Sequence, residues 1–166
     1  RSLVGSEMCI RDSRSGDFSQ QIQAMDASFQ AMEANLLSCT LWNYTADNDN
    51  RWGDQWNEED FSIFSRDQQT HPDHLDSGGR ALLSALRPYP RCIAGEPLQM
   101  RFDYRSGEFY FRFRHHDGIE KPTEIYVPQY HYPHGCTIEV SDGAFRMLYE
   151  EQTLVYERSL QRTEHT

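Results

Sequence analysis

The stretch Glu96–Gly118, EPLQMRFDYRSGEFYFRFRHHDG, decides the fold of the second half of the chain. Apolar and polar residues alternate in it along two runs, which Arg105–Gly107 separates. The alternating aromatic residues are Phe102, Tyr104, Phe109, Phe111 and Phe113. A period of two places one set of side chains on one face of a strand, and a short Gly-containing interval between two such runs is typical of a β-hairpin. The stretch therefore predicts two antiparallel strands joined by a tight turn.

Shorter strand-like runs follow the predicted hairpin, with Pro and Gly residues between them. These runs are Thr123–Pro128, Cys136–Asp142, Phe145–Glu151 and Gln152–Arg158. Short strands with turn signals at this spacing are typical of a β-sandwich. We therefore expect residues 91–156 to form a small antiparallel β-sandwich domain and residues 157–166 to be a frayed polar tail.

The first half of the chain shows a helical period instead. From Phe18 to Leu36, apolar residues recur at intervals of three and four, which marks one face of an amphipathic helix. Asp17 and Gln20 suit a capping pair at its start. We interpret this helix as core-facing and without chemistry. A second helix is predicted for Ser77–Pro88, which its serine would cap and its proline would end.

A short, nearly continuous apolar run, Leu36–Tyr44, comes directly after the first predicted helix. Such a run predicts a strand that is buried on both faces, as in a parallel sheet. A helix followed by a buried strand is typical of an α/β fold. We therefore expect residues 14–90 to be the end of an α/β unit, so that the whole chain is α/β plus all-β.

The stretch Leu41–Phe61 combines large aromatic residues with a polar sequence. It holds all three Trp residues of the chain, and Asn and Asp surround them. An indole covers the apolar face of a pyranose ring, and Asn and Asp side chains bind the sugar hydroxyls. In α/β folds the loops at the carboxyl ends of the strands carry the binding site. The stretch therefore indicates a carbohydrate site; the alternative is that the Trp residues are structural and the Asn and Asp residues only turn the chain.

Two segments carry a resemblance to a known family. TLWNYTADNDNRWGDQWNEEDFSIFSRD, residues 40–67, and GGRALLSALRPYPRCIAGEP, residues 78–97, resemble the C-terminal portion of glycoside hydrolase family 5 enzymes. The similar branch contains the endoglycoceramidases and the glucosylceramidases or sterylglucosidases. The resemblance implies that residues 14–90 are the C-terminal remnant of a (β/α)8 TIM barrel and that the β-sandwich follows it.

The resemblance also implies a site and a reaction. Trp42 would lie at the end of the last barrel strand and form the floor of the subsite for the non-reducing sugar. The substrate-binding residues implied for this wall are Trp42, Asn43, Tyr44, Asp47, Asn48 and Trp52. The family's enzymes are retaining β-glycosidases that use two Glu residues, and this branch implies a glycolipid or other β-glucoside substrate, of the glucosylceramide or sterylglucoside type.

Neither catalytic Glu is expected in this chain. The general acid/base normally follows an Asn at an earlier strand end, and the chain contains no Asn-Glu-Pro sequence. Glu58, Glu59 and Asp60 are interpreted as a solvated acidic run. We therefore expect this polypeptide to be inactive by itself, although its parent protein hydrolyses O-glycosidic bonds.

The first thirteen residues, RSLVGSEMCIRDS, have neither a helical nor a strand period. They also lack the apolar core of a signal peptide. Residues 1–13 resemble translated sequencing-adapter read-through, so we expect them to be a disordered artefact and the native N-terminal part to be missing.

Charge and composition exclude several classes of partner. The net charge of −10 argues against nucleic acid, and no apolar run approaches the ~20 residues of a membrane span, which leaves peripheral contact with membrane lipid open. The four widely spaced Cys residues predict lone buried thiols without a disulfide framework and favour a cytoplasmic location, although the compartment stays open. His115-His116 and His131 with His134 lack further ligands nearby, so no metal and no cofactor is expected. The oligomeric state is left open.

A second hypothesis concerns the β domain alone. Its aromatic residues could hold sugar or glycolipid without any catalysis, which would make it a non-catalytic binding module. The candidates are Phe102, Phe109, Phe111, Tyr126, Tyr130 and Tyr132. A third hypothesis is that the β domain only buttresses the barrel, since aromatic residues at a period of two usually form the core of a sheet.

Overall fold

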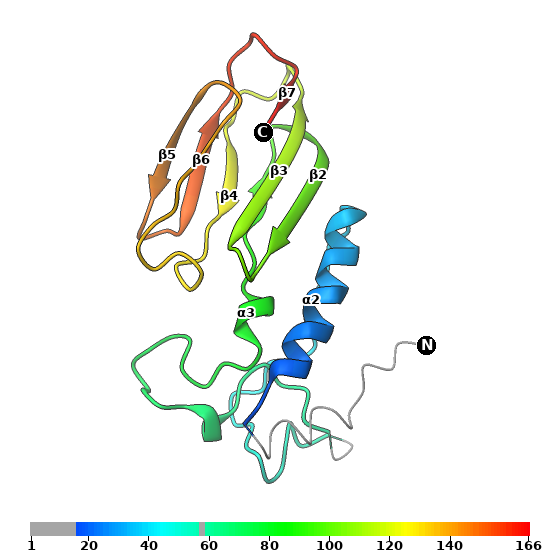
Figure 1. Ribbon diagram of the computed structural model, residues 1–166, viewed down its shortest axis with the longest axis vertical. Helices are drawn as coiled ribbons and strands as arrows, with labels where there is room; N and C mark the ends of the chain where they lie inside the picture. Colours follow the sequence, from blue (N-terminus) through cyan, green and yellow to red (C-terminus); the bar gives the residue numbers. More distant parts are fainter. Residues whose placement is uncertain (1–15, 57–58) are drawn as a thin grey trace. The chain divides into compact units, whose positions relative to one another are not determined.

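The computed structural model describes residues 16–56 and 59–166, which form two compact units (Figure 1). The described residues up to Phe29, together with Ser38–Ala85, form what we call the loop unit. Gln30–Leu37 and Leu86–Thr166 form the β unit. Helix α2 (Ser19–Ala34) contributes its first part to the loop unit and its last part to the β unit.

The β unit contains two antiparallel sheets (Figure 1). The four-stranded sheet has the order β1-β4-β6-β5 and the three-stranded sheet has the order β2-β3-β7. The bounds are β1 Tyr89–Cys92, β2 Gly95–Asp103, β3 Glu108–His115, β4 Thr123–Tyr126, β5 Ala144–Leu148, β6 Thr153–Glu157 and β7 Glu164–His165. The expected antiparallel character of this part of the chain is therefore confirmed.

The hairpin predicted from Glu96–Gly118 is confirmed. Strands β2 and β3 pair antiparallel, with Phe102 opposite Phe109. The amide of Gly107 donates to the carbonyl of Asp103 across 2.8 Å and closes the turn. Gly107 has a φ of +72°, a left-handed conformation that glycine adopts without steric cost.

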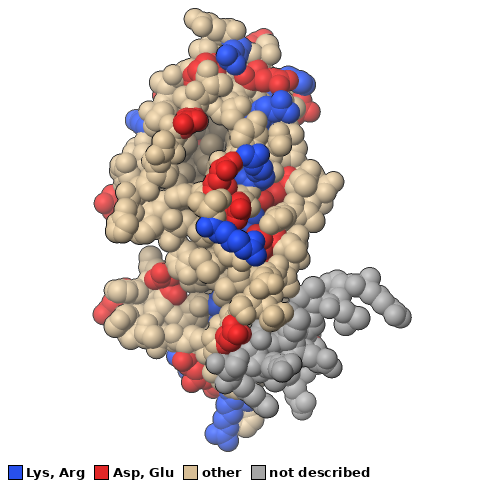
Figure 2. Space-filling view, in the orientation of Figure 1, with Lys and Arg blue, Asp and Glu red and all other residues tan. Residues whose placement is uncertain are grey.

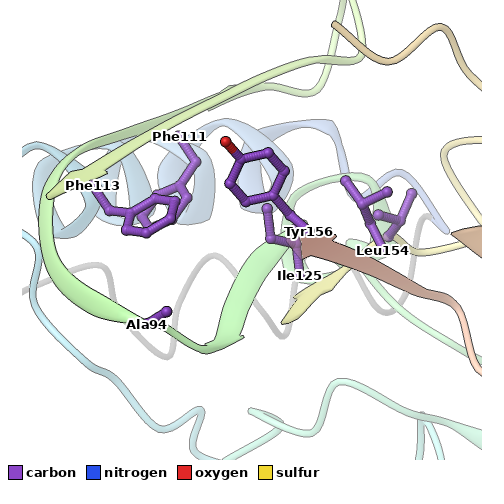
Figure 3. Packing of buried hydrophobic residues seen from close by; sticks show 7 residues of the cluster. Ala94, Phe111, Phe113, Ile125, Leu154 and Tyr156 are labelled. Atoms are coloured by element: carbon purple, nitrogen blue, oxygen red, sulfur yellow. The ribbon is translucent and has the colours of Figure 1, made fainter. Parts of the chain in front are cut away.

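The core of the β unit lies between strands of both sheets. Its buried members are Ala94, Phe111, Phe113, Ile125, Val127, Leu154 and Tyr156. Figure 3 shows Phe111 and Phe113 from β3 facing the same interior as Tyr156 from β6. The rings of Phe111 and Phe113 stack with centroids 5.7 Å apart. The alternation that predicted the hairpin thus also supplies the core.

Charged side chains of both signs are interleaved over the three-stranded sheet (Figure 2). The ion pairs there are Arg101–Glu108, Arg112–Glu164, Arg114–Glu96 and Arg114–Glu164. All of these side chains are at least 40% exposed, so each pair contributes little to stability. This sheet therefore presents an electrically balanced outer surface.

The prediction of a frayed tail at residues 157–166 is wrong. Strand β7 pairs with β3, with Phe113 opposite His165 and Arg114 opposite Glu164. His165 is completely buried. Two polar residues of this segment have partners in the β unit: Glu164 pairs with Arg114 at 3.0 Å, and His165 contacts Asp142 at 2.7 Å.

Asp142 is the centre of a buried polar network in the β unit. Its carboxylate accepts hydrogen bonds from the side chains of Ser141, Tyr156 and Ser159, and from the amide of Ser159, and it contacts Nδ1 of His165. Burial alone would raise the pKa of Asp142, but the hydrogen bonds from Ser159, His165, Ser141 and Tyr156 outweigh it and hold the pKa well below its ordinary value. The ionised carboxylate therefore ties β7 to the core.

Replacing Asp142 with Asn is expected to lower the free energy of unfolding of the β unit by about 2 kcal/mol at pH 7. A carboxylate with a depressed pKa stabilises the fold above its unfolded pKa of about 3.9, and this contribution is lost as the pH falls through the folded value. The difference between the parent chain and D142N should therefore be full at pH 6–7 and shrink below about pH 4. Urea unfolding followed by circular dichroism at several pH values measures it; a difference that grows in acid would contradict this role.

One predicted strand of the β unit is absent. Residues 136–142 form no strand, although Ile138 and Val140 pack against the core. Alternating apolar residues gave burial here without a hydrogen-bonded partner strand, so the prediction for Cys136–Asp142 is wrong.

The helix predicted from the apolar period is confirmed as α2, and Asp17 Oδ1 accepts from the amide of Ser19 at 3.0 Å at its start. This hydrogen bond lowers the pKa of Asp17. The buried face differs from the expected apolar one, because it includes Asp26 and Glu33 beside Phe29. The helix therefore carries buried carboxylates that need partners. None of the helices in the described part of the chain is long and apolar enough to cross a membrane.

The strand predicted for Leu36–Tyr44 does not form. Leu37 is 60% exposed and Leu41 is 43% exposed, and no described strand pairs with this segment. A doubly buried strand needs a sheet on both sides and cover on both faces. The apolar run therefore lies exposed in this structure.

The helix predicted for Ser77–Pro88 is shortened to α3 (Leu82–Ala85). Gly78 has a φ of +87° and Ala81 a φ of +54°, neither of which continues a helix. Gly79 forms a β-bridge with Phe64, and Ser77 Oγ accepts from the amides of residues 70 and 71 instead of capping a helix. A 3-10 helix, η1 (Arg66–Gln68), is the other regular element nearby.

Candidate functional site

The loop unit contains a buried group of polar side chains that are hydrogen-bonded to Arg80. This guanidinium is 1% exposed and donates to Asp60 at 2.5 Å, Asn50 at 2.8 Å and Gln68 at 2.9 Å. It also reaches the carbonyl of Ser62 at 3.4 Å. This segment has few aliphatic residues, and hydrogen bonds to the buried guanidinium of Arg80 hold it together instead. The expectation that Asp60 belongs to a solvated acidic run is wrong, because it is 4% exposed and paired; Glu58 lies outside the described residues.

Asn48 is the second support of the loop. It has no exposed surface, and its Nδ2 donates to the carbonyl of Phe64 at 2.9 Å. Its own carbonyl accepts from the amide of Arg66 at 2.9 Å. The expected place of Asn48 on the rim of a sugar site is therefore not what this structure shows, since the side chain is enclosed by the loop that it holds.

Asn43 and Asp54 fix the position of Trp42. Asn43 Nδ2 donates to Asp54 Oδ2 at 2.9 Å, and the carbonyl of Asn43 accepts from the amide of Ile63 at 3.0 Å. The Trp42–Asn43 peptide bond is cis. Trp42 is 67% exposed, and its ring meets that of Trp56 edge to face with centroids 5.6 Å apart. Two indole rings thus lie in contact at the surface, and the hydrogen bond between Asn43 and Asp54 lies next to them in the sequence.

The other predicted aromatic residues of this segment are also exposed. Tyr44 is 65% exposed and leans on Phe64 with ring centroids 5.7 Å apart. Trp52 is 62% exposed, and the guanidinium of Arg51 lies 4.7 Å from the centre of its ring. Most of the surface of both side chains is therefore accessible to solvent.

Asp47 is exposed, and it accepts a hydrogen bond from Gln55 at 3.1 Å. Of the six predicted site residues, five retain accessible surface and Asn48 does not. Trp56 is 57% exposed and forms the ring pair with Trp42. Exposed indoles beside carboxylates and amides have the chemistry to bind a sugar ring.

The aromatic residues proposed for a binding platform in the β unit are mostly part of its interior. Phe102 and Phe111 are 2% and 6% exposed, and Phe109 packs against the core. The hydroxyl of Tyr132 donates to the carbonyl of Gly107 at 2.8 Å. They therefore present no row of exposed rings.

The cysteine prediction is corrected in one respect. Cys39, Cys92 and Cys136 are free, but all three are exposed and not buried. Cys9 lies outside the described residues. Within residues 16–56 and 59–166, no cluster of three or more His, Cys, Asp or Glu side chains has a metal-binding arrangement.

Three relatives show what the chain is similar to. It is 37% identical over 171 residues to a glucosylceramidase of Rhizopus delemar, a match that covers 95% of this chain and 25% of the relative. It is 28% identical to an ergosteryl-β-glucosidase of Saccharomyces cerevisiae, over 83% of this chain and 25% of that protein. Its structure matches sterylglucosidase 1 of Cryptococcus neoformans with a TM-score of 0.79 and 34% identity, over 91% of this chain and 23% of that one.

The chain thus spans about a quarter of the length of the curated relatives it matches. A family model matches the part that contains all seven strands: residues 87–166 fit the glycoside hydrolase family 5 C-terminal domain. The resemblance carried by the sequence motifs and this match agree. Residues 87–166 of the chain are therefore a glycoside hydrolase family 5 C-terminal domain.

Proposed function

We propose that this chain is the C-terminal part of a retaining β-glycosidase that hydrolyses the O-glycosidic bond of a glycolipid, of the glucosylceramide or sterylglucoside type. In this proposal residues 14–90 are the end of a (β/α)8 barrel and residues 91–156 are a β-sandwich. The chain supplies one wall of the sugar site, and the two catalytic Glu residues come from another part of the protein. A retaining enzyme needs its two carboxyl groups about 5 Å apart.

The observation that carries the proposal is the exposed pair of Trp42 and Trp56. A protein rarely leaves an indole two-thirds exposed, and here Asn43 and Asp54 anchor it from below. The ring contact of 5.6 Å fixes its tilt. Relatives named glucosylceramidase and ergosteryl-β-glucosidase are similar along most of this chain, which supports a glucoside as the ligand.

The buried carboxylates support the view that the catalytic pair lies elsewhere. Glu33 and Asp60 are both committed to arginine partners inside their units. A general acid must instead face the glycosidic oxygen. The 166-residue chain should therefore release no glucose from glucosylceramide or from a sterylglucoside. Detectable release would contradict the proposal that the catalytic Glu residues lie in another part of the protein.

Replacing Trp42 with Ala should weaken binding of methyl β-D-glucopyranoside to this chain about tenfold, because stacking on an aromatic ring contributes about 1 kcal/mol and more when the ring also excludes water. All three Trp residues lie in the loop unit, so intrinsic Trp fluorescence reports on this wall alone. The expected result is a saturable fluorescence change in the parent chain that the W42A variant shows only at far higher sugar concentration.

Tyr149→Ala is the matched control, because Tyr149 is 63% exposed but lies in the β unit. It should leave the titration unchanged. A variant Trp42→Phe should retain part of the binding, since it keeps an aromatic face. If Y149A weakened sugar binding as much as W42A, the wall would not be in the loop unit.

A further inference from the structure

The β unit contains a cavity of about 500 Å³. Residues of both sheets line it, and so does the irregular segment 136–140 that replaced a predicted strand. In Figure 2 a hollow opens in the upper part of the molecule, mostly among residues drawn in tan, with acidic residues at its edge. Ligand pockets in proteins have volumes of about 300–1,000 Å³, so the cavity has room for a small molecule.

Most of the wall of this cavity is apolar. Phe109 and Phe113 come from β3, Ile125 from β4 and Leu154 from β6, while Ile138 and Val140 close the side. An apolar void gains no hydrogen bonds from water, and such cavities in proteins take up apolar molecules. Each methylene group transferred from water into such a site contributes about 0.8 kcal/mol.

The charged residues among the lining residues are acidic only. They are Glu108 and Glu139, and no Lys, Arg or His belongs to the lining. Two further ionisable groups are neutral at pH 7: burial raises the pKa of Tyr132 to about 12, and partial desolvation by neighbouring atoms raises the pKa of Cys136, although its side chain keeps accessible surface. Glu108 is paired with Arg101, and the lining holds no Lys, Arg or His side chain that would bind a carboxylate or phosphate of a ligand. The cavity therefore favours an uncharged ligand.

We propose that this cavity binds the uncharged apolar part of a lipid, either a sterol ring system or an alkyl chain. The site is separate from the Trp42 wall, since every lining residue belongs to the β unit. It goes beyond the proposed glycosidase function and does not rest on it. The aromatic residues Phe109, Phe111 and Tyr132 act here from inside the unit and not as an exposed platform.

Binding of tritiated cholesterol, tritiated ceramide and tritiated palmitate to the 166-residue chain, measured by gel filtration, tests the proposal. Saturable binding of cholesterol or of ceramide is the expected result, and the tighter of the two identifies the chemistry that the cavity prefers. Palmitate should bind at least about tenfold more weakly, which corresponds to about 1.4 kcal/mol. Absence of saturable binding by both neutral lipids, or equally tight binding of palmitate, would overturn the proposal.

Filling the cavity supplies the matched test. Ile138→Trp adds volume at a partly buried lining residue and should weaken neutral-lipid binding at least about tenfold. Ile119→Trp makes the same change at a 37% exposed position outside the lining, and should leave binding within about twofold. Should I138W not unfold cooperatively, Val140→Phe replaces it. Unchanged binding in a folded cavity-filled variant would place the lipid elsewhere.

The two sites can fail independently. Trp42→Ala should weaken glucoside binding about tenfold and leave lipid binding intact, whereas Ile138→Trp should weaken lipid binding and leave glucoside binding intact. Loss of both responses in one variant would indicate unfolding, which the circular dichroism spectrum of that variant would show.

Discussion

Replacing Glu33 with Ala is expected to destabilise the β unit by about 3–5 kcal/mol, because the change breaks the buried ion pair between Glu33 and Arg87. Glu33 and Arg87 are each 5% exposed. Glu33 accepts from Arg87 Nε at 2.5 Å and from its second nitrogen at 3.0 Å, which is a bidentate pair. The same carboxylate accepts from the amide of Phe102 at 3.1 Å.

Arg87 completes a closed set of contacts. It donates to the carbonyl of Phe102 at 2.8 Å, and its guanidinium lies 4.9 Å from the centre of that ring. Glu33 and Arg87 together therefore bind both backbone groups of one residue in β2. Loss of Glu33 removes the acceptor of the buried amide of Phe102 and two hydrogen bonds of the Arg87 guanidinium, while the bond from Arg87 to the Phe102 carbonyl remains.

Urea unfolding followed by far-ultraviolet circular dichroism measures this effect, since the strands belong to the β unit. Glu33→Gln should lose less than E33A, because one oxygen can still accept. The control is Glu150→Ala, which removes an exposed carboxylate in the same unit and should change the free energy of unfolding by less than about 0.5 kcal/mol. Equal effects of E33A and E150A would show that the ion pair contributes nothing beyond net charge.

The β-hairpin could be predicted because its determinants are local. Alternating aromatic residues and one glycine turn lie within a single stretch, and the register from Gln99 to Asp103 in β2 follows from them, whereas the irregularity between Pro97 and Gln99 does not. The run Leu36–Tyr44 could not be assigned in the same way. A short apolar run indicates that a segment can be buried, but it does not indicate which neighbours bury it. Whether Leu36–Tyr44 forms a strand depends on partner strands that its own sequence does not specify.

The polar cores of both units were missed because their partners are far apart in the sequence. Glu33 and Arg87 are separated by 54 positions, and Arg80 and Asn50 by 30. The residue types alone suggested solvated surface, which is where most Glu and Arg residues lie. The exposure of the three Trp residues is easier to predict, because their neighbours in the sequence are polar. The ring contact between Trp42 and Trp56 could not be predicted from the number of residues between them.

The second large effect is expected at Arg80, whose partner Asp60 is 20 positions away in the sequence. Arg80→Met should destabilise the loop unit by about 3–5 kcal/mol, because it leaves a buried carboxylate unpaired. Asp60 is 4% exposed and pairs with Arg80 through Oδ1, and within residues 16–56 and 59–166 its Oδ2 has no hydrogen-bond partner. Asn50 and Gln68 would each lose a donor as well. Methionine fills a similar volume but donates nothing.

Trp fluorescence during urea unfolding measures the loop unit separately from the β unit, since all three Trp residues belong to it. The R80M variant should shift the fluorescence transition to lower urea, and Arg80→Lys should not restore it, because an ammonium cannot reproduce the planar fork that reaches Asp60, Asn50 and Gln68. Arg66→Met is the matched control: Arg66 is exposed, and its backbone bond to Asn48 survives the change. If R66M shifted the transition as far as R80M, the stability of the wall that holds Trp42 would depend on overall charge and not on the buried arginine.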